Sequence, residues 1–285
     1  MLKRKRIFLS SSLFISCLTS ASTLTQSTFD IEQQISGSIG VSVIDTHSYK
    51  QWDYNGNDQF PMMSTFKTLA CAKMLKDAEM GQLDLSVSTT IESNKLMLWS
   101  PITQELVGKP ISVEKACEAT MLTSDNTAAN IVLDHVGGPQ GITSFLRFIG
   151  DYVTRLDRFE PELNQALLGD ERDTTTPIAM NKTLQRILYQ NVLGNASQKQ
   201  LKGWMQGNVV SDALLRSILP QGWSIADRSG AGQNGSRGIT AIIWKEQRSP
   251  IFISIYLTNT KLSMAERNSV INEIGMHIFE EYSVK

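Results

Sequence analysis

Apolar and polar positions alternate near the N-terminal end of the chain, follow helical spacing in the middle, and give way to short apolar runs toward the C-terminus. Residues 38–43 alternate and predict a strand, and residues 49–54 predict its hairpin partner, followed by a turn at Asn55-Gly56. Toward the C-terminus, short apolar runs predict three more strands, and helical spacing then predicts a final helix, over residues 224–227, 239–244, 251–257 and 263–281.

The middle of the chain carries helical patterns that one long polar segment interrupts. A helix predicted over residues 64–80 ends at Gly81. Further helices are predicted over residues 112–122, 127–136, 141–149, 177–189 and 197–208. The sequence Gly137-Gly138-Pro139 is expected to end the helix over 127–136. Residues 151–176 are polar and predict a long structured loop, and loops of that length within a domain are often functional.

Strands at both chain ends around a helical middle predict an α/β (α+β) fold. We expect an antiparallel sheet built from the two ends and flanked by helices, with a mostly helical lobe inserted. The predicted single domain covers residues 23–285, with a sheet lobe of about 23–60 and 211–285 and a helical lobe of about 61–210. A site is expected in the cleft between the lobes.

Composition and charge exclude some classes of partner and site. The 285 residues are 41% hydrophobic and 19% charged, which suits one or two globular domains with a sizeable core. Four of the 27 basic residues lie within residues 3–6, so the remainder of the chain has 23 basic against 28 acidic residues and gives no reason to expect a nucleic-acid partner. His47, His135 and His277 are scattered and show no metal-ligand spacing, so no metal site is predicted.

The N-terminus predicts a secretory signal peptide over residues 1–22, and hence an exported protein. A basic tip precedes an apolar run over residues 7–18, and small residues at 20–22 offer a cleavage site. The run is too short for a stable bilayer-spanning helix, and no later membrane segment is predicted. An uncleaved interfacial anchor is one alternative. Lipid attachment at Cys17 is another, although residues 14–17 match the lipoprotein pattern poorly.

Removal of the signal leaves Cys71 and Cys117. An even pair of cysteines in an exported protein predicts a disulfide. The alternative is two buried thiols, because free cysteine is often part of a core.

Ser64 and Lys67 lie three positions apart at a predicted helix start, so their side chains share one face. A serine hydroxyl needs a nearby base to act as a nucleophile, and a desolvated lysine can serve. The alternative is a serine cap beside a solvated lysine. Ser112 and Lys115 repeat the Ser-x-x-Lys pattern, so the pattern alone is close to chance level.

Ser124-Asp125-Asn126 joins two predicted helices. These residue types are common helix caps, but Ser124 could also relay a proton to a leaving nitrogen, while the Asn126 amide holds a substrate carbonyl. In the long loop, Glu160 and Asn164 could grip one water for general-base hydrolysis. The alternative for Glu160 is a surface carboxylate.

Two residues of the long loop carry opposite charges. Arg158 and Asp173 could pair and fix the loop, which matters only if the pair is buried.

Arg228-Ser229-Gly230 offers a cation, a hydroxyl and a close backbone approach for a substrate carboxylate, which Arg237 could also reach. The alternative is a hairpin with exposed arginines.

The order and spacing of these four motifs resemble the class A serine β-lactamases. The likeness covers nearly all of the mature chain, including both cysteines, the loop around Glu160, and residues 235–238. Where the family usually has Lys-Thr-Gly, this chain has Arg228-Ser229-Gly230, the form of the carbenicillin-hydrolysing branch. Carbenicillin carries a second carboxylate, so the extra guanidinium charge is expected to favour it.

The resemblance implies a serine β-lactamase/penicillin-binding-protein-like fold and hydrolysis of penicillins, including carbenicillin, through an acyl-enzyme. Ser64 would be the nucleophile, with Lys67 as its base partner or Glu160 acting through a water. The other implied catalytic residues are Ser124 as proton donor and Ala231, whose N–H joins that of Ser64 around the oxyanion. The implied substrate-binding residues are Trp99, Asn126, Asn164, Arg228, Ser229, Gly230 and Arg237.

The resemblance also implies a periplasmic monomer, or a secreted one if the source lacks an outer membrane. It implies a small-molecule β-lactam substrate, no cofactor and no stable membrane association after processing. The alternatives are a penicillin-binding transpeptidase or carboxypeptidase, and a β-lactam sensor domain, each of which acylates without turnover. Glu160 with Asn164 argues against the former, and the sequence shows no membrane-anchored signalling chain for the latter.

Overall fold

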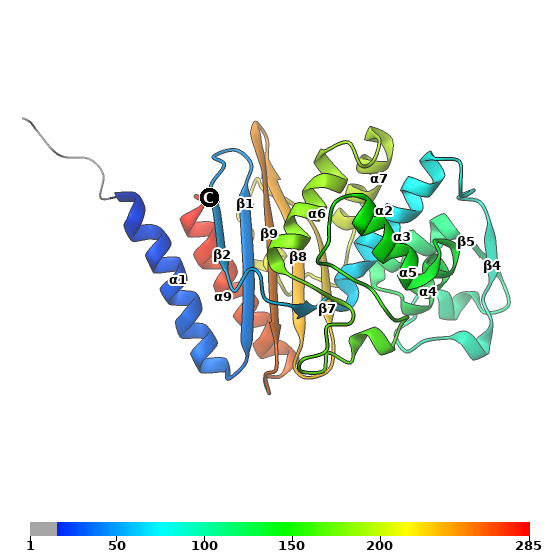
Figure 1. The fold of residues 1–285 in the computed structure, drawn as a ribbon, viewed down its shortest axis with the longest axis horizontal. Coiled ribbons are helices and arrows are strands. Elements are labelled where there is room, and N and C mark those ends of the chain that lie inside the picture. Colours follow the sequence, from blue (N-terminus) through cyan, green and yellow to red (C-terminus); the bar gives the residue numbers. More distant parts are fainter. Residues whose placement is uncertain (1–15) are drawn as a thin grey trace, which may run out of the picture.

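The computed structural model describes residues 16–285, with side chains from residue 23 onward. A five-stranded antiparallel sheet has the order β2–β1–β9–β8–β7, so its strands come from both chain ends (Figure 1). Its strands are β1 (Ser38–Asp45), β2 (Gln51–Tyr54), β7 (Ser224–Ala231), β8 (Arg237–Lys245) and β9 (Arg248–Thr258). This confirms the predicted fold class.

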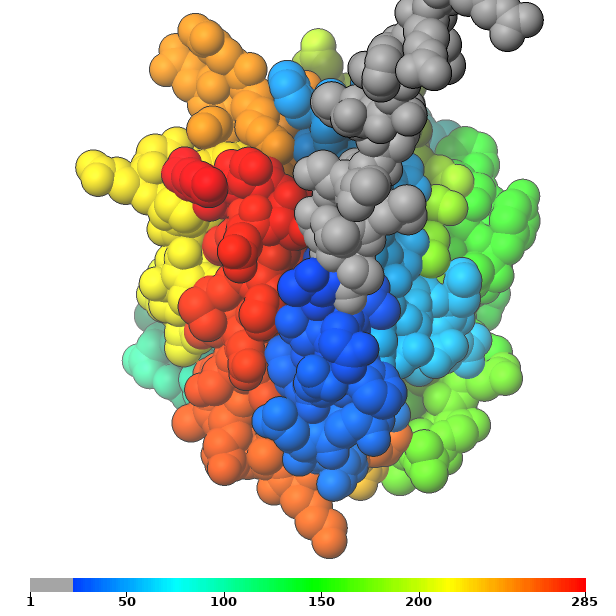
Figure 2. Space-filling model, turned by 90° about the vertical axis from the view of Figure 1, so that its left-hand side faces the viewer, coloured from blue at the N-terminus to red at the C-terminus, as the bar shows by residue number. Residues whose placement is uncertain are grey.

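Two helices lie side by side on one face of the sheet, the N-terminal α1 (Ser16–Ile35) and the C-terminal α9 (Met264–Glu281) (Figures 1 and 2). The strands turn alternate residues toward them, so Ile253, Ile255 and Leu257 of β9 join one hydrophobic core with both helices. Ser263 and Glu266 form a capping box that fixes the start of α9.

The other face of the sheet packs against a helical layer around α2 (Phe66–Glu79), which is buried on most sides. Its neighbours are α3 (Val113–Thr123), α4 (Asn126–His135), α5 (Gly138–Phe148) and α7 (Asn195–Gln206). Helix α6 (Pro177–Tyr189) packs against β1, β9 and α7. The short elements are β3 (Phe60–Pro61), β4 (Ser88–Thr90), β5 (Pro110–Ser112), β6 (Thr174–Thr175), α8 (Leu215–Ile218), η1 (Met63–Thr65), η2 (Ser93–Lys95), η3 (Thr103–Leu106) and η4 (Glu162–Asn164).

Two local predictions differ from the structure. Gly137 has a positive φ and ends the α4 segment as expected, but Gly138 and Pro139 open α5 instead of remaining in the turn. Proline is tolerated there because the first helical N–H groups have no partner within the helix. The strand predicted over 224–227 continues to Ala231, so the Arg-Ser-Gly motif lies inside β7.

The disulfide predicted from the even cysteine count is confirmed: Cys71 of α2 is bonded to Cys117 of α3. The predicted signal peptide falls largely on residues 1–15, which lie outside the described residues. Within residues 16–285 no helix combines the length and hydropathy of a bilayer span. The division into lobes near residues 60 and 211 stays a prediction.

Candidate active site

A cleft of about 550 Å³ opens where β7, the start of α2 and the junction of α3 with α4 meet. Of the residues predicted from sequence, its wall contains Ser64, Trp99, Ser124, Asn126, Asn164, Ser229, Gly230, Ala231 and Arg237. It also contains residues that the sequence did not single out: Val209, Val210, Ala213, Met264 and Asn268. Lys67, Glu160 and Arg228 are buried and do not line the cleft.

Ser64 lies in the η1 turn that leads directly into α2, and the preceding Met63 has a φ of 49°, which is unusual for a residue with a side chain. Such backbone geometry persists only where the surrounding structure holds it. Gly230 of β7 packs closely against this turn, because a Cβ there would lie 2.7 Å from both the backbone nitrogen of Ser64 and the Cβ of Met63. Glycine therefore lets β7 lie against the Ser64 backbone, with Ala231 next in the strand.

Lys67 lies one turn into α2 and is completely buried. Its Nζ is 2.6 Å from Asn126 Oδ1, 3.0 Å from the carbonyl oxygen of Ser124 and 3.2 Å from both Ser124 Oγ and Glu160 Oε1. Burial lowers the pKa of Lys67 to about 8, the Glu160 carboxylate opposes this shift and the Arg228 charge adds to it. Since all four contacts are acceptors, the site holds the ammonium form.

Ser124 joins α3 to α4 in a left-handed conformation, with a φ of 63°. Its hydroxyl donates to Ser64 Oγ at 3.2 Å, so Lys67, Ser124 and Ser64 form one chain of hydrogen bonds. The neighbouring Asp125 is a helix cap, as its residue type suggested, because its carboxylate accepts from the backbone N–H of Ala128. The cap and the candidate catalytic chain therefore coexist at this junction.

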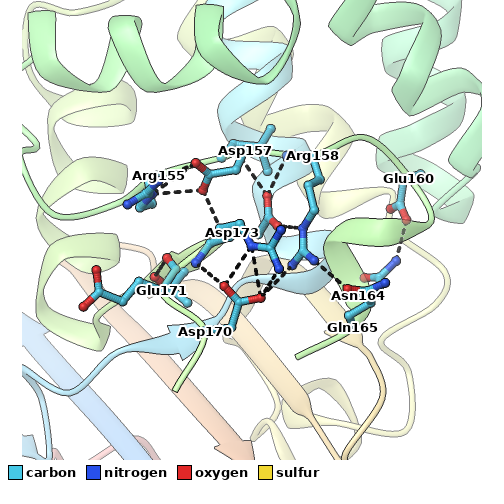
Figure 3. A network of polar contacts seen from close by, with 12 residues as sticks. Arg155, Asp157, Arg158, Glu160, Asn164, Gln165, Asp170, Glu171 and Asp173 are labelled. Carbon is cyan, nitrogen blue, oxygen red and sulfur yellow. Dashed lines mark hydrogen bonds and ion pairs between the residues drawn. The ribbon is translucent and has the colours of Figure 1, made fainter. Parts of the chain in front are cut away.

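Glu160 lies in the 151–176 loop, and its Oε2 accepts a hydrogen bond from Asn164 Nδ2, as Figure 3 shows. Asn130 of α4 binds the backbone of Glu160 twice: its Oδ1 accepts the N–H at 3.0 Å and its Nδ2 donates to the carbonyl at 2.9 Å. Asn130 was not predicted from the sequence, although it follows Asn126 by one helical turn. It fixes the Glu160 backbone beside Lys67.

The 151–176 loop is held by the pair that the sequence suggested (Figure 3). Asp173 is buried, and its Oδ2 lies 2.5 Å from Arg158 Nε. Its other oxygen accepts the backbone N–H groups of Asp157 and Arg158, at 2.7 and 3.0 Å. Arg158 also donates to Gln165, next to Asn164. The pair is therefore buried and ties the C-terminal part of the loop, at Asp173, to the segment that carries Glu160.

The two arginines expected to bind an anion lie at different depths. Arg237 lines the cleft, and its guanidinium donates to Asn268 Oδ1 at 2.9 Å and to the carbonyl oxygen of Gly230 at 3.1 Å. Arg228 lies behind it and donates to the carbonyl oxygen of Ser64 at 3.2 Å and to Asn208 Oδ1 at 3.2 Å. Burial lowers the pKa of each to about 10, so both are cations at neutral pH.

Residues 23–285 contain no group of three or more histidine, cysteine, aspartate or glutamate side chains placed to hold a metal ion.

A family model described as the β-lactamase enzyme family matches residues 23–282. The chain belongs to the β-lactamase enzyme family. The β-lactamases CARB-3 and PSE-4 of Pseudomonas aeruginosa are each 54% identical to it over 253 residues, which is 89% of this chain and 88% of theirs.

Solved structures of β-lactamases agree with this assignment. The crystal structure of the chromosome-encoded β-lactamase of Vibrio parahaemolyticus is 54% identical, with a TM-score of 0.91 over 92% of this chain and all of that one. The class A β-lactamase of the last common ancestor of Gram-negative bacteria is 41% identical, with a TM-score of 0.89 over 91% of this chain and 99% of that one. The resemblance to the carbenicillin-hydrolysing branch of class A is confirmed.

Proposed function

We propose that this β-lactamase is an exported enzyme that hydrolyses penicillins, including carbenicillin, through an acyl-enzyme on Ser64. The observation that carries this proposal is the buried chain from Lys67 through Ser124 to Ser64, with Glu160 3.2 Å behind Lys67. A weak nucleophile, a proton donor and a carboxylate thus converge on one cleft.

In acylation, Ser64 Oγ attacks the lactam carbonyl carbon. Glu160 takes the hydroxyl proton through a water, because the Lys67 ammonium in this geometry has only acceptors around it. The C–N bond then breaks, and Ser124 gives its proton to the ring nitrogen while Lys67 replaces it. The carbonyl oxygen is stabilised by the backbone N–H groups of Ser64 and Ala231.

The walls of the cleft bind the rest of the antibiotic. Ser229 and Arg237 receive the substrate carboxylate at the lining, and the buried Arg228 adds positive charge from behind. Asn126 contacts the side-chain amide of the penicillin. Trp99 is 60% exposed, and its Nε1 donates to the Thr123 carbonyl, so its ring forms a fixed apolar wall.

In deacylation, Glu160 and Asn164 hold a water that attacks the ester carbonyl. Before this attack, the proton that Glu160 took in acylation passes to Lys67, which gave one to Ser124, across their 3.2 Å contact. Glu160 can then accept the proton of the attacking water, and as the ester bond breaks this proton passes to Ser64 Oγ and the penicilloate leaves. This step separates the proposed enzyme from a penicillin-binding protein or a β-lactam sensor, which would remain acylated. The hydrogen bond between Asn164 and Glu160 supports it.

Export is supported by the basic and apolar N-terminus and by the disulfide, which is typical of oxidising compartments. We place the mature enzyme in the periplasm, or outside the cell where no outer membrane exists, as a monomer without stable membrane association. Fractionation of an expressing strain, together with intact mass of the mature chain, tests both the compartment and cleavage near residue 22.

The activity test mixes the purified mature protein with excess carbenicillin, counts product per enzyme, and then measures the protein mass. Many turnovers without a persisting adduct are expected. Glu160→Gln should acylate more slowly and then retain one acyl group on Ser64, whereas Glu162→Gln, at an exposed carboxylate of the same loop, should turn over normally. One equivalent consumed by the wild type, with a stable adduct, would instead identify a penicillin-binding protein or sensor. If the wild type showed no turnover and formed no adduct, β-lactam chemistry would be excluded.

A further inference from the structure

Ser229 of β7 lines the cleft, and its hydroxyl has a partner behind it. Ser211, which is completely buried in the connection between α7 and α8, donates a hydrogen bond to Ser229 Oγ at 2.8 Å. Ser211 is absent from the cleft lining and therefore has no direct access to a ligand there. Its contact with Ser229 links the cleft to a buried polar network.

Asn208 fixes the direction of the hydrogen bond between the two serines. Its Nδ2 donates to Ser211 Oγ at 2.7 Å and to Asp227 Oδ1 at 2.6 Å. Its Oδ1 accepts from Arg228 Nη1 at 3.2 Å and from the backbone N–H of Val210 at 3.1 Å. A flipped amide would place two donors against donors and an acceptor against a carboxylate, so only one orientation satisfies the site.

The network leaves each hydroxyl with one role. Ser211 Oγ receives a hydrogen from Asn208 and donates its own to Ser229 Oγ at 2.8 Å. The Asp227 carboxylate, which also interacts with Ser211, already accepts from Asn208 Nδ2 at 2.6 Å and from Arg216 Nε at 2.7 Å. Ser229 Oγ then accepts from behind, and its own hydrogen makes no hydrogen bond with residues 23–285. Because a free serine hydroxyl rotates, this contact determines that Ser229 presents a donor to the cleft instead of a lone pair.

We propose that Ser211 is a positioning residue that aims the Ser229 hydroxyl hydrogen at the carboxylate of the bound β-lactam. The inference rests on the proposed function, in which Ser229 and Arg237 receive that carboxylate. A hydroxyl that presented a lone pair would repel an anion, whereas a donor held in place strengthens a charge-assisted hydrogen bond. Asn208 and Asp227 act further back, by keeping Ser211 in its donating orientation.

The test compares benzylpenicillin with its methyl ester, which lacks the anionic group. Ser211→Ala should lower kcat/KM for the free acid by about fivefold to tenfold, mainly through KM, the size expected for one hydrogen bond to a charged group. It should leave kcat/KM for the ester within about twofold. In a Ser229→Ala background, Ser211→Ala should have no further effect on the acid, because the hydroxyl that it orients is gone. Ser211→Thr should restore most of the selectivity for the acid.

Ser254→Ala is the matched control, since Ser254 is also buried and donates to a single side chain, Asn181, at 2.7 Å. It should cost similar thermal stability without changing the ratio of acid to ester rates. Equal losses on acid and ester in Ser211→Ala, or an undiminished loss in the Ser229→Ala background, would overturn the inference alone. A wild-type protein that leaves benzylpenicillin intact would overturn the proposed function as well.

Discussion

Lys67 Nζ lies 3.2 Å from Glu160 Oε1, and neither side chain has any surface exposed to solvent. Desolvation disfavours the ammonium, while the carboxylate favours it, and the balance lowers the pKa of Lys67 to about 8. The amine is therefore protonated at neutral pH. Its hydrogens hold Ser124 and Asn126 as well as Glu160 in one arrangement.

This protonation state predicts how activity depends on pH. Below pH 8 Lys67 keeps its proton, and above pH 8 it loses one of the donors that order the site, so kcat/KM for benzylpenicillin should decline above about pH 8. Arg228 and Arg237 keep their charges over this range, because their pKa values are about 10. Rates measured from pH 6 to 9 provide the check. A rate that keeps rising through pH 8 to 9 would identify the free amine as the base.

Asp173→Asn should disorganise the loop that carries Glu160. The substitution removes the buried negative charge 2.5 Å from Arg158 Nε and leaves Asp170, at 3.6 Å, as the carboxylate that faces this guanidinium, which is expected to cost about 3 kcal/mol of unfolding free energy. Acylation and deacylation should both slow, since Glu160, the proposed base of both steps, lies on this loop. Denaturant unfolding and pre-steady-state kinetics measure the two effects. Arg155→Gln, at a more exposed ion pair, serves as the control and should change both by little.

Replacement of both disulfide cysteines by alanine should destabilise the protein without disabling it. The bond closes a loop of 46 residues between α2 and α3, so its loss should lower the unfolding free energy by about 4 kcal/mol in the chain-entropy model. Both sulfur atoms are buried and neither residue lines the cleft. kcat at 15 °C should therefore stay within a factor of about two, as for changes distant from a site. A Tm equal to that of the wild type would refute this estimate.

Arg228→Lys should shift selectivity away from carbenicillin. The guanidinium reaches the Ser64 carbonyl, the Met121 carbonyl and Asn208 at once, and a single ammonium cannot replace that spread of charge. The ratio of kcat/KM for carbenicillin to that for benzylpenicillin should fall by roughly threefold, the effect of moving one charge near a second carboxylate. An unchanged ratio would show that the arginine does not serve carbenicillin.

Local patterns in the sequence were enough to predict the sheet and most helices. Alternation in residues 38–43 and the apolar run over 251–257 indicate strands, and the structure pairs these strands directly and buries both. Helix α1 was missed because its buried apolar residues, among them Leu24 and Ile31, are sparse among serine and threonine. The start of α5 was missed because Gly138-Pro139 fits a turn and a helix start equally well.

Motifs located the chemical groups of the site but not their depth or their supports. Nothing in the residue types shows that Arg228 lies behind the cleft while Arg237 lines it, because this depends on how β7 packs against α2. Ser211 and Asn208 follow a helix without any motif, and they reach Ser229 and Asp227 only through the tertiary fold. Such non-local contacts leave no periodic signal in a single sequence.

The order of the strands also constrains the order of synthesis. β9 lies between β1 and β8, so the first strand of the chain has no neighbour on that side until residues 248–258 exist. A nascent chain that has already made Ser64 and Lys67 thus still lacks the strand that joins β7 and β8 to the N-terminal part of the sheet. The sheet that carries β7, and with it the wall of the cleft, is therefore completed only when translation is nearly finished.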